Sequence, residues 1–181
     1  MNNSVFREYD IRGIVDKDFS DDFVFNLGKA LGSYLINNNE YDISVSGDIR
    51  YSTKRLKIKL IEGLLCVGIN VCDIGILPTP VNYFSLFNTK IHNSIQVTGS
   101  HNPPEYNGFK MNKGTAAMAG NSIQELLKVF LQSEFKLGEG SIKNTDVLSN
   151  HIDSVIKNID TPKRKLKIAI DCGNAVAGPA M

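Results

Sequence analysis

Apolar residues recur at helical spacing early in the chain and then alternate with short β-prone runs. Ser20 and two aspartates precede a stretch in which apolar side chains return every three or four residues as far as residue 35. This pattern predicts an amphipathic helix with Ser20 as its N-cap. Residues 43–45 then form a β-prone run, and a second helical pattern covers residues 56–67, with Ser52 as the predicted N-cap.

The same alternation continues to residue 97. Residues 71–74 read as a strand, residues 81–87 as a helix that follows Pro78 and Pro80, and residues 94–97 as another strand. Alternating strands and helices predict the α/β class: a layered α/β/α domain with a mostly parallel mixed sheet. Such folds place ligands at loops that follow the carboxyl ends of strands, so the loop after residue 97 is the first candidate for a site.

The second half of the chain is less regular. Residues 106–111 can return from that loop as a strand, Ser122 and Glu125 have the spacing of a capping box for a following helix, and residues 166–170 read as a strand after a basic linker. A strand with about ten residues after it cannot bury a core. We therefore expect a domain over residues 1–136, a connecting helix and linker over 137–165, and the truncated start of a second domain over 166–181.

Composition and charge argue against several classes of protein. The 181 residues carry 20 basic and 19 acidic side chains, so a net charge of +1 offers no broad attraction for nucleic acid or for anionic membranes. No apolar run approaches the roughly 18 residues of a membrane span, and we expect a cytoplasmic protein. Three cysteines without a CxxC pair favour buried free thiols over a disulfide or a zinc site.

The loop after residue 97 carries the strongest candidate chemistry. Ser100 follows a buried strand, His101 and Asn102 come next, and two prolines then stiffen the loop, which gives a rigid exposed hydroxyl beside a potential proton carrier. Gly99 would let a ligand approach the main chain, and Lys110 can bring a positive charge to a phosphate. The alternative is a plain turn with a surface histidine. No acid has the spacing of a hydrolase triad, and the G-x-S-x-G motif is absent.

Two further segments place charged residues beside glycines. In residues 6–13, Arg12 precedes Gly13 and is a candidate for bidentate contact with phosphate, although a solvated strand edge would look the same. After the strand at 43–45, Asp48 and Arg50 can either bind an anion or buttress the loop by a salt bridge. The position of this pair between a strand and a helix favours the buttress.

Taken together, these segments resemble the α-D-phosphohexomutase superfamily of the phosphomannomutase/phosphoglucomutase type. The resemblance covers its amino-terminal domain and the start of its second domain. Gly99, between a threonine and a serine, favours this branch over the phosphoglucosamine mutases. The matching segments, in the family's order and spacing, are YDIRG at 9–13, GDIRYS at 47–52, PTP at 78–80, TGSHNPP at 98–104 with YNGFK at 106–110, and DCGN at 171–174.

The resemblance implies roles for individual residues. Ser100 would be the phosphorylated residue, and its phosphate would help to bind Mg²⁺. His101 and Lys110 would handle protons and charge during transfer. The substrate-binding residues would be Tyr9, Arg12 and Asn102, the last of which also shapes the loop.

The implied activity is the interconversion of hexose 6-phosphate and hexose 1-phosphate, with mannose or glucose as the sugar. It would proceed through a phosphoserine and a 1,6-bisphosphate intermediate, with glucose or mannose 1,6-bisphosphate as activator. The family's magnesium, sugar and carboxyl-terminal phosphate loops have no counterpart in the 181 residues, so we expect the chain alone to be inactive. The alternative is a truncated, non-catalytic module that binds sugar phosphates or a partner.

Overall fold

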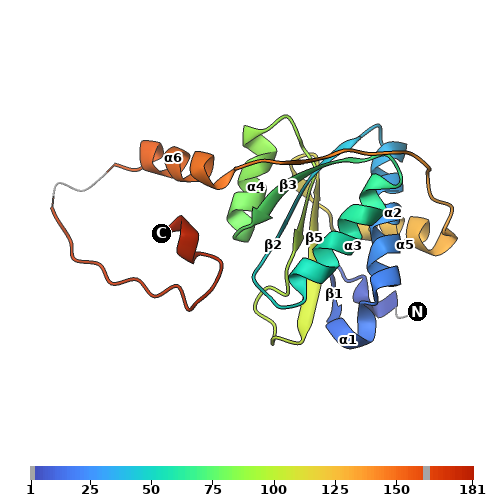
Figure 1. The fold of residues 1–181 in the computed structure, drawn as a ribbon, viewed down its shortest axis with the longest axis horizontal. Helices are drawn as coiled ribbons and strands as arrows, with labels where there is room; N and C mark the ends of the chain where they lie inside the picture. The colour runs from blue at the N-terminus through green and yellow to red at the C-terminus, as the bar shows by residue number, and fades with distance from the viewer. Residues whose placement is uncertain (1–2, 161–163) are drawn as a thin grey trace.

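The computed structural model describes residues 3–160 and 164–181. Its first half confirms the predicted alternation of helices and strands (Figure 1). The elements up to the candidate loop are η1 (Asn3–Val5), β1 (Ile11–Ile14), α1 (Val15–Asp18), α2 (Asp21–Asn37), β2 (Asp42–Gly47), α3 (Thr53–Leu65), β3 (Asn70–Ile76), α4 (Thr79–Asn88) and β4 (Ser94–Val97). After the loop come β5 (Tyr106–Lys113), β6 (Ala116–Ala117), α5 (Asn121–Gln132), β7 (Ile142–Asn144), α6 (Leu148–Asn158) and η2 (Gly178–Ala180).

The strands form one seven-stranded sheet in the order β1-β5-β4-β2-β3-β7, with β6 paired to β5. The four strands β4, β2, β3 and β7 lie side by side and are parallel to one another. Since β1, β4 and β6 all pair antiparallel with β5, β5 runs against the other described strands. The sheet is therefore mixed and mostly parallel, and the predicted α/β class is confirmed.

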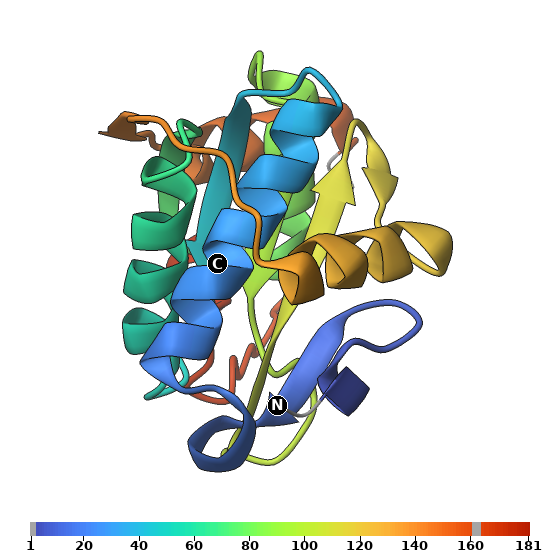
Figure 2. The ribbon, with the colours of Figure 1, turned by 90° about the vertical axis from the view of Figure 1, so that its right-hand side faces the viewer.

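Helices cover both faces of the sheet and complete the α/β/α layers. Helices α2, α3 and α5 lie on one face, and α4 lies on the other (Figures 1 and 2). Side chains along β4 alternate between the two faces. Ile95 and Val97 join the larger hydrophobic core, whereas Gln96 points to the α4 side and donates to the carbonyl of Leu77. A smaller core holds α4 and the start of α6 on that second face, with Ile74, Leu77, Val81 and Val147 among its members.

The backbones of α2 and α3 touch, and glycine makes this possible. A Cβ placed on Gly28 would collide with the carbonyl oxygen of Leu60, and one on Gly63 would collide with the carbonyl oxygen of Phe25. Without side chains at these two positions, the helices can pack at a distance that any other residue would prevent. The two closely packed helices together cover the larger core on this face of the sheet.

The helix starts agree with the sequence only in part. Ser20 caps α2 as predicted, since its Oγ accepts a hydrogen bond from the backbone N–H of Phe23 at 3.1 Å. Ser52 does precede α3, but its side chain makes no capping bond and instead accepts from Asn107.

The predicted capping box of α5 is wrong. The helix begins at Asn121 after Gly120, and the Ser122 hydroxyl bonds the backbone of Ala119. Glu125 reaches across to α2, where it accepts a hydrogen bond from the Tyr34 hydroxyl at 3.3 Å. Burial, reinforced by this carboxylate, raises the pKa of Tyr34 above 10.0.

The edge strand β7 was not predicted. Residues 142–144 pair in parallel with β3, although all three side chains are exposed. Gly140 sits against the backbone of Ile69, where a Cβ would collide, and its N–H bonds the carbonyl of Leu65. A polar strand held by backbone contacts leaves no hydrophobic alternation, so the sequence carries no signal for it.

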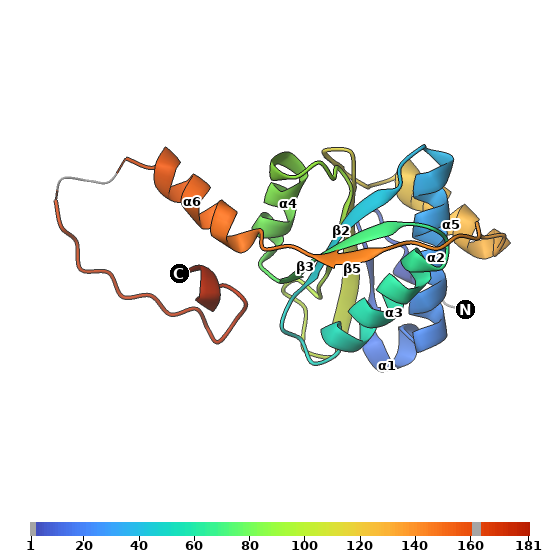
Figure 3. The ribbon, with the colours of Figure 1, turned by 45° about the horizontal axis from the view of Figure 1, so that its top comes forward.

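Residues 166–170 do not form the predicted strand. Their backbone pairs with no other described strand, and Leu166, Ile168 and Ile170 are each more than half exposed. The segment runs well clear of the sheet beyond α6 (Figures 1 and 3). A β-prone sequence becomes a strand only where a second strand can satisfy its backbone, and none stands beside this one. Within the connecting helix and linker predicted over 137–165, residues 161–163 lie outside the described residues.

Two smaller expectations can be compared with the structure. All three cysteines are free, as predicted, but only Cys72 is buried, while Cys66 and Cys172 are half-buried. Among the described helices, none has both the length and the apolar character needed to cross a membrane.

The close crossing of α2 and α3 predicts that Gly28→Ala destabilises the fold. Alanine is the better helix former, yet its methyl group must push the two backbones apart, so we expect a loss of about 1–3 kcal/mol in the free energy of unfolding, measured with urea. Gly178→Ala is the matched control, because a Cβ there meets nothing within 4 Å. Equal stability of the two variants would show that the helices do not pack this closely.

Candidate active site

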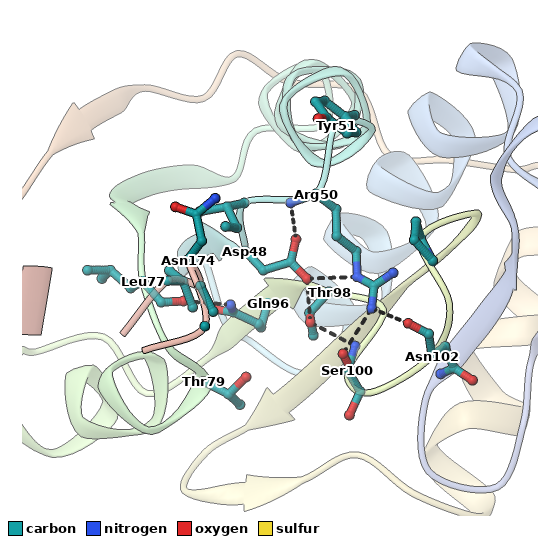
Figure 4. A pocket seen from close by; sticks show the side chains of 15 residues that line it. Asp48, Arg50, Tyr51, Leu77, Thr79, Gln96, Thr98, Ser100, Asn102 and Asn174 are labelled. Carbon is teal, nitrogen blue, oxygen red and sulfur yellow. Dashed lines mark hydrogen bonds and ion pairs between the residues drawn. The ribbon is translucent and has the colours of Figure 1, made fainter. Parts of the chain in front are cut away.

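The candidate loop, residues 98–105, opens into a cleft of about 630 Å³. The loops that follow β2, β3 and β4 line the cleft, together with residues 173–176 (Figure 4). These loops lie at the carboxyl ends of parallel strands, where an α/β sheet is expected to bind its ligands. Ser100 and Asn102 are among the lining residues.

Ser100 has an exposed side chain and an unusual backbone conformation. Its φ angle is 55°, in the left-handed region, which costs a residue with a side chain about 1 kcal/mol. Its N–H donates to Thr98 Oγ1 at 2.9 Å, and its Oγ lies 3.3 Å from Nδ1 of His101. The turn therefore presents the serine hydroxyl outward with an imidazole beside it.

Arg50 binds four carbonyl oxygens in and just after this turn, and the bonds to Ser100 and Asn102 can be followed in Figure 4. Nη2 donates to the carbonyls of Ser100 at 3.0 Å and Asn102 at 2.6 Å. Nη1 donates to those of Pro103 at 2.6 Å and Tyr106 at 3.0 Å. A planar guanidinium with forked donors suits such a set of acceptors, and the loop takes its shape around it.

Asp48 in turn orients Arg50 and the base of the loop. Its Oδ2 lies 3.3 Å from Arg50 Nε and accepts a hydrogen bond from Thr98 Oγ1 at 2.8 Å. Its Oδ1 accepts from the backbone N–H of Arg50 at 3.0 Å and from Thr53 Oγ1 at 2.6 Å. The Asp48–Arg50 pair therefore acts as the buttress that its sequence position favoured, and its carboxylate is fully used.

Gly99 has a different role from the one expected. A Cβ at this position would lie 2.6 Å from Nε and Cζ of Arg50 and 2.8 Å from the carbonyl oxygen of Tyr106. The space that we assigned to an approaching ligand is filled by the guanidinium. Asn102 also binds this glycine, since its side chain and its backbone N–H both donate to the Gly99 carbonyl, at 2.8 Å and 3.1 Å.

Arg12 and Lys110 meet at a buried carboxylate that the sequence reasoning missed. Asp10 is 5% exposed, and its Oδ2 accepts from both Arg12 and Lys110, the latter at 3.5 Å. The register of β1 on β5 sets Arg12 opposite Gly108, two residues before Lys110. The acid two positions before Arg12 was the available signal, although Asp10 lies in a bend before β1 and not in the strand itself.

The predicted site residues thus form two groups on one face of the sheet. Lys110 on β5 lies opposite Gln96 on β4, and the Gln96 side chain points to the α4 face. Two residues after Gln96, Thr98 begins the loop that carries Ser100. Lys110 and Arg12 therefore share the sheet face that leads to the Ser100 loop, although neither lines the cleft. Tyr9 lies before β1 and is 72% exposed, and it also lies outside the cleft lining.

A chain of buried polar side chains supports the floor of the cleft. Gln96 donates to the Leu77 carbonyl at 2.9 Å and accepts from the Ser46 hydroxyl. The network continues through α4 to the far end of β5, by way of Asn82, Ser94 and Asn112. Such a satisfied network fixes one arrangement of the strands beneath the loop. Sequence alone gave no sign of it, because its members lie far apart in the chain.

The described residues do not by themselves form a metal site. Over residues 3–160 and 164–181, no three or more histidine, cysteine, aspartate or glutamate side chains gather as a metal would require. The acid that lines the cleft, Asp48, already accepts three hydrogen bonds and forms an ion pair with Arg50. A metal at Ser100 would therefore need carboxylate ligands from beyond these residues.

The shared carboxylate predicts that Asp10→Asn destabilises the protein. The amide keeps the shape but leaves Arg12 and Lys110 without a compensating charge, so we expect a loss of about 1–3 kcal/mol in the free energy of unfolding. The control is Glu62→Gln, since that side chain is 45% exposed in its pair with Lys59 and its loss should stay within about 0.5 kcal/mol. A loss for Asp10→Asn as small as that of the control would contradict the shared role.

Comparison with known proteins places this geometry in a family. Residues 3–137 match the family model described as phosphoglucomutase/phosphomannomutase, alpha/beta/alpha domain I. A phosphomannomutase/phosphoglucomutase of Pseudomonas putida is 35% identical over 178 residues, which are 98% of this chain and 38% of that protein. A phosphoglucomutase of Neisseria gonorrhoeae is 36% identical over 180 residues, or 98% of this chain and 39% of that one.

Among solved structures, the chain is similar to a phosphoglucomutase/phosphomannomutase family protein from Burkholderia thailandensis. The TM-score is 0.92 at 38% sequence identity, and the match covers 99% of this chain and 41% of the other. The chain therefore spans about two fifths of the length of these proteins. Because the family model covers most of the 181 residues, the chain belongs to the phosphoglucomutase/phosphomannomutase family and contains its α/β/α domain I.

Proposed function

We propose that the complete protein containing these residues is a phosphohexomutase that interconverts hexose 6-phosphate and hexose 1-phosphate. The observation that carries the proposal is the exposed Ser100 hydroxyl, held in a left-handed turn at the mouth of the cleft of a family domain I. Mannose or glucose would be the sugar, in keeping with the names of the relatives.

The proposed chemistry runs through a phosphoserine. The Oγ–P bond of phosphorylated Ser100 breaks, and the phosphoryl group passes to the free hydroxyl of a hexose monophosphate, which gives up its proton. The serine oxygen takes up a proton, and a hexose 1,6-bisphosphate results. After the bisphosphate turns round, its other phosphate returns to Ser100 by the same steps, so glucose or mannose 1,6-bisphosphate would act as activator. An in-line approach and stabilisation of the transferring charge are the physical demands.

The site geometry supports distinct roles for the predicted residues. His101 Nδ1, 3.3 Å from Ser100 Oγ, is within one hydrogen bond of the atom that loses and gains a proton. Lys110 would stabilise the transferring charge. The substrate contacts would be Arg12 and Tyr9 on the sugar phosphate and Asn102 at the loop.

The complete protein has to supply what this domain lacks. We propose Mg²⁺ as cofactor, bound to the phosphate on Ser100 and to carboxylates outside the described residues, where it would offset the phosphate charge. Ser100 is exposed in the cleft, and exclusion of water, which would hydrolyse the phosphoserine, also needs further domains. On this proposal residues 1–136 are the phosphoserine domain, residues 137–165 connect, residues 166–181 begin the next domain, and the 181 residues alone have little activity.

Mass spectrometry of the complete gene product tests the role of Ser100. Incubation with glucose 1,6-bisphosphate should leave one phosphate on the protein, and peptide mapping should place it at Ser100. Ser100→Ala should abolish both the phosphate and the interconversion of glucose 1- and 6-phosphate, whereas Ser154→Ala, on α6, should change neither. A phosphate that persists in Ser100→Ala, or a wild type that accepts none, would overturn the proposal.

A further inference from the structure

We propose that Arg50 is a positioning residue for phosphoryl transfer, which acts by fixing the main chain around Ser100 and not by binding phosphate. This inference rests on the proposed function of Ser100. It concerns a residue that contacts neither the serine hydroxyl nor the Arg12–Lys110 group in any bond described above. The inference is drawn from the hydrogen bonds and the ion pair that the Arg50 guanidinium forms.

Arg50 has no free Nη donor for an anion, and its Nε faces a carboxylate. A guanidinium carries five N–H groups. In this structure Nη1 and Nη2 make four bonds to loop carbonyls, and Nε faces the Asp48 carboxylate at 3.3 Å. The side chain is 16% exposed, and its charge is offset by that of Asp48. A phosphate could bind Arg50 only after bonds to the loop were broken.

These bonds also orient the peptide groups of the loop. Four carbonyl oxygens, including that of Ser100 itself, point towards the guanidinium. The negative ends of these peptide dipoles are therefore turned inward and neutralised, and do not face a dianionic phosphate on Ser100 Oγ. The same bonds hold the left-handed φ of 55° at Ser100, which sets the direction of its side chain.

The four bonds from Arg50 to the loop carbonyls form a clamp that depends on the shape of arginine and not on its charge. A lysine would bring one positive charge but only three donors from one atom, and could not serve four carbonyls and Asp48 at once. Gly99 lies against the guanidinium, where a Cβ would come within 2.6 Å of two of its atoms. Gly99→Ala should therefore disturb the same clamp without altering Arg50.

The test measures phosphoryl transfer by the complete gene product carrying Arg50→Lys, Gly99→Ala or both. We expect each single variant to lower kcat about 100-fold with little change in KM, because the loss is one of geometry in the transition state. The double variant should be no worse than the poorer single one, since both changes break one clamp. Arg55→Lys is the matched control: this arginine on α3 bonds Asp21 at 2.6 Å and should retain wild-type rates.

The outcomes separate the inference from the function on which it rests. A wild type that takes up no phosphate overturns the proposed function, and this inference with it. A reactive wild type with an equally reactive Arg50→Lys overturns the inference alone. A higher KM at unchanged kcat would assign Arg50 to substrate binding instead. To exclude misfolding, circular dichroism and thermal melting of each variant should match wild type, and activity lost only in proportion to unfolded protein would also contradict the inference.

Discussion

The geometry of the candidate site depends on one ion pair, Asp48 with Arg50. The pair sits directly after β2, the central strand of the parallel part of the sheet, and reaches over to the loop that joins β4 to β5. One end is anchored to the start of α3 through Thr53, and the other binds the loop through four carbonyls. Each charge is paired with the other and also forms hydrogen bonds, and these interactions offset the desolvation cost of burying the pair.

The two faces of the sheet have different tasks. One face is covered by three helices and provides the larger core. On this face α2 and α3 pack closely against each other at Gly28 and Gly63. On the other face, α4 packs on β2 and β4, and the polar side chains of Gln96, Lys110 and Arg12 lie on the adjoining strands. The larger core therefore lies on one face, and the second face combines a smaller core with the polar side chains that lead to the candidate site. This division lets a strained serine turn be tolerated at the edge of the sheet.

Sequence patterns predicted the features that depend on local spacing. The cap of α2 and the bounds of β4 both follow from residues close together in the chain. The fork of Arg50 joins residues some 50 positions apart, and its four acceptors are backbone atoms that no residue type reveals. Gly99 was assigned to a ligand for the same reason, because the neighbour that fills its space is distant in sequence. The prediction of a strand at 166–170 was wrong, because the sequence pattern shows which side chains are apolar but not whether a second strand lies alongside.

Amide hydrogen exchange, measured by NMR on the unphosphorylated protein, tests the central claim most directly. If the loop is rigid before any phosphate arrives, the amides of Ser100, Asn102 and Tyr106, which bond Thr98, Gly99 and Pro103, should exchange as slowly as those in β4 and β5. Exchange of these three amides at the rate of an unfolded chain, beside protected strands, would show that no clamp holds the loop and would contradict the account.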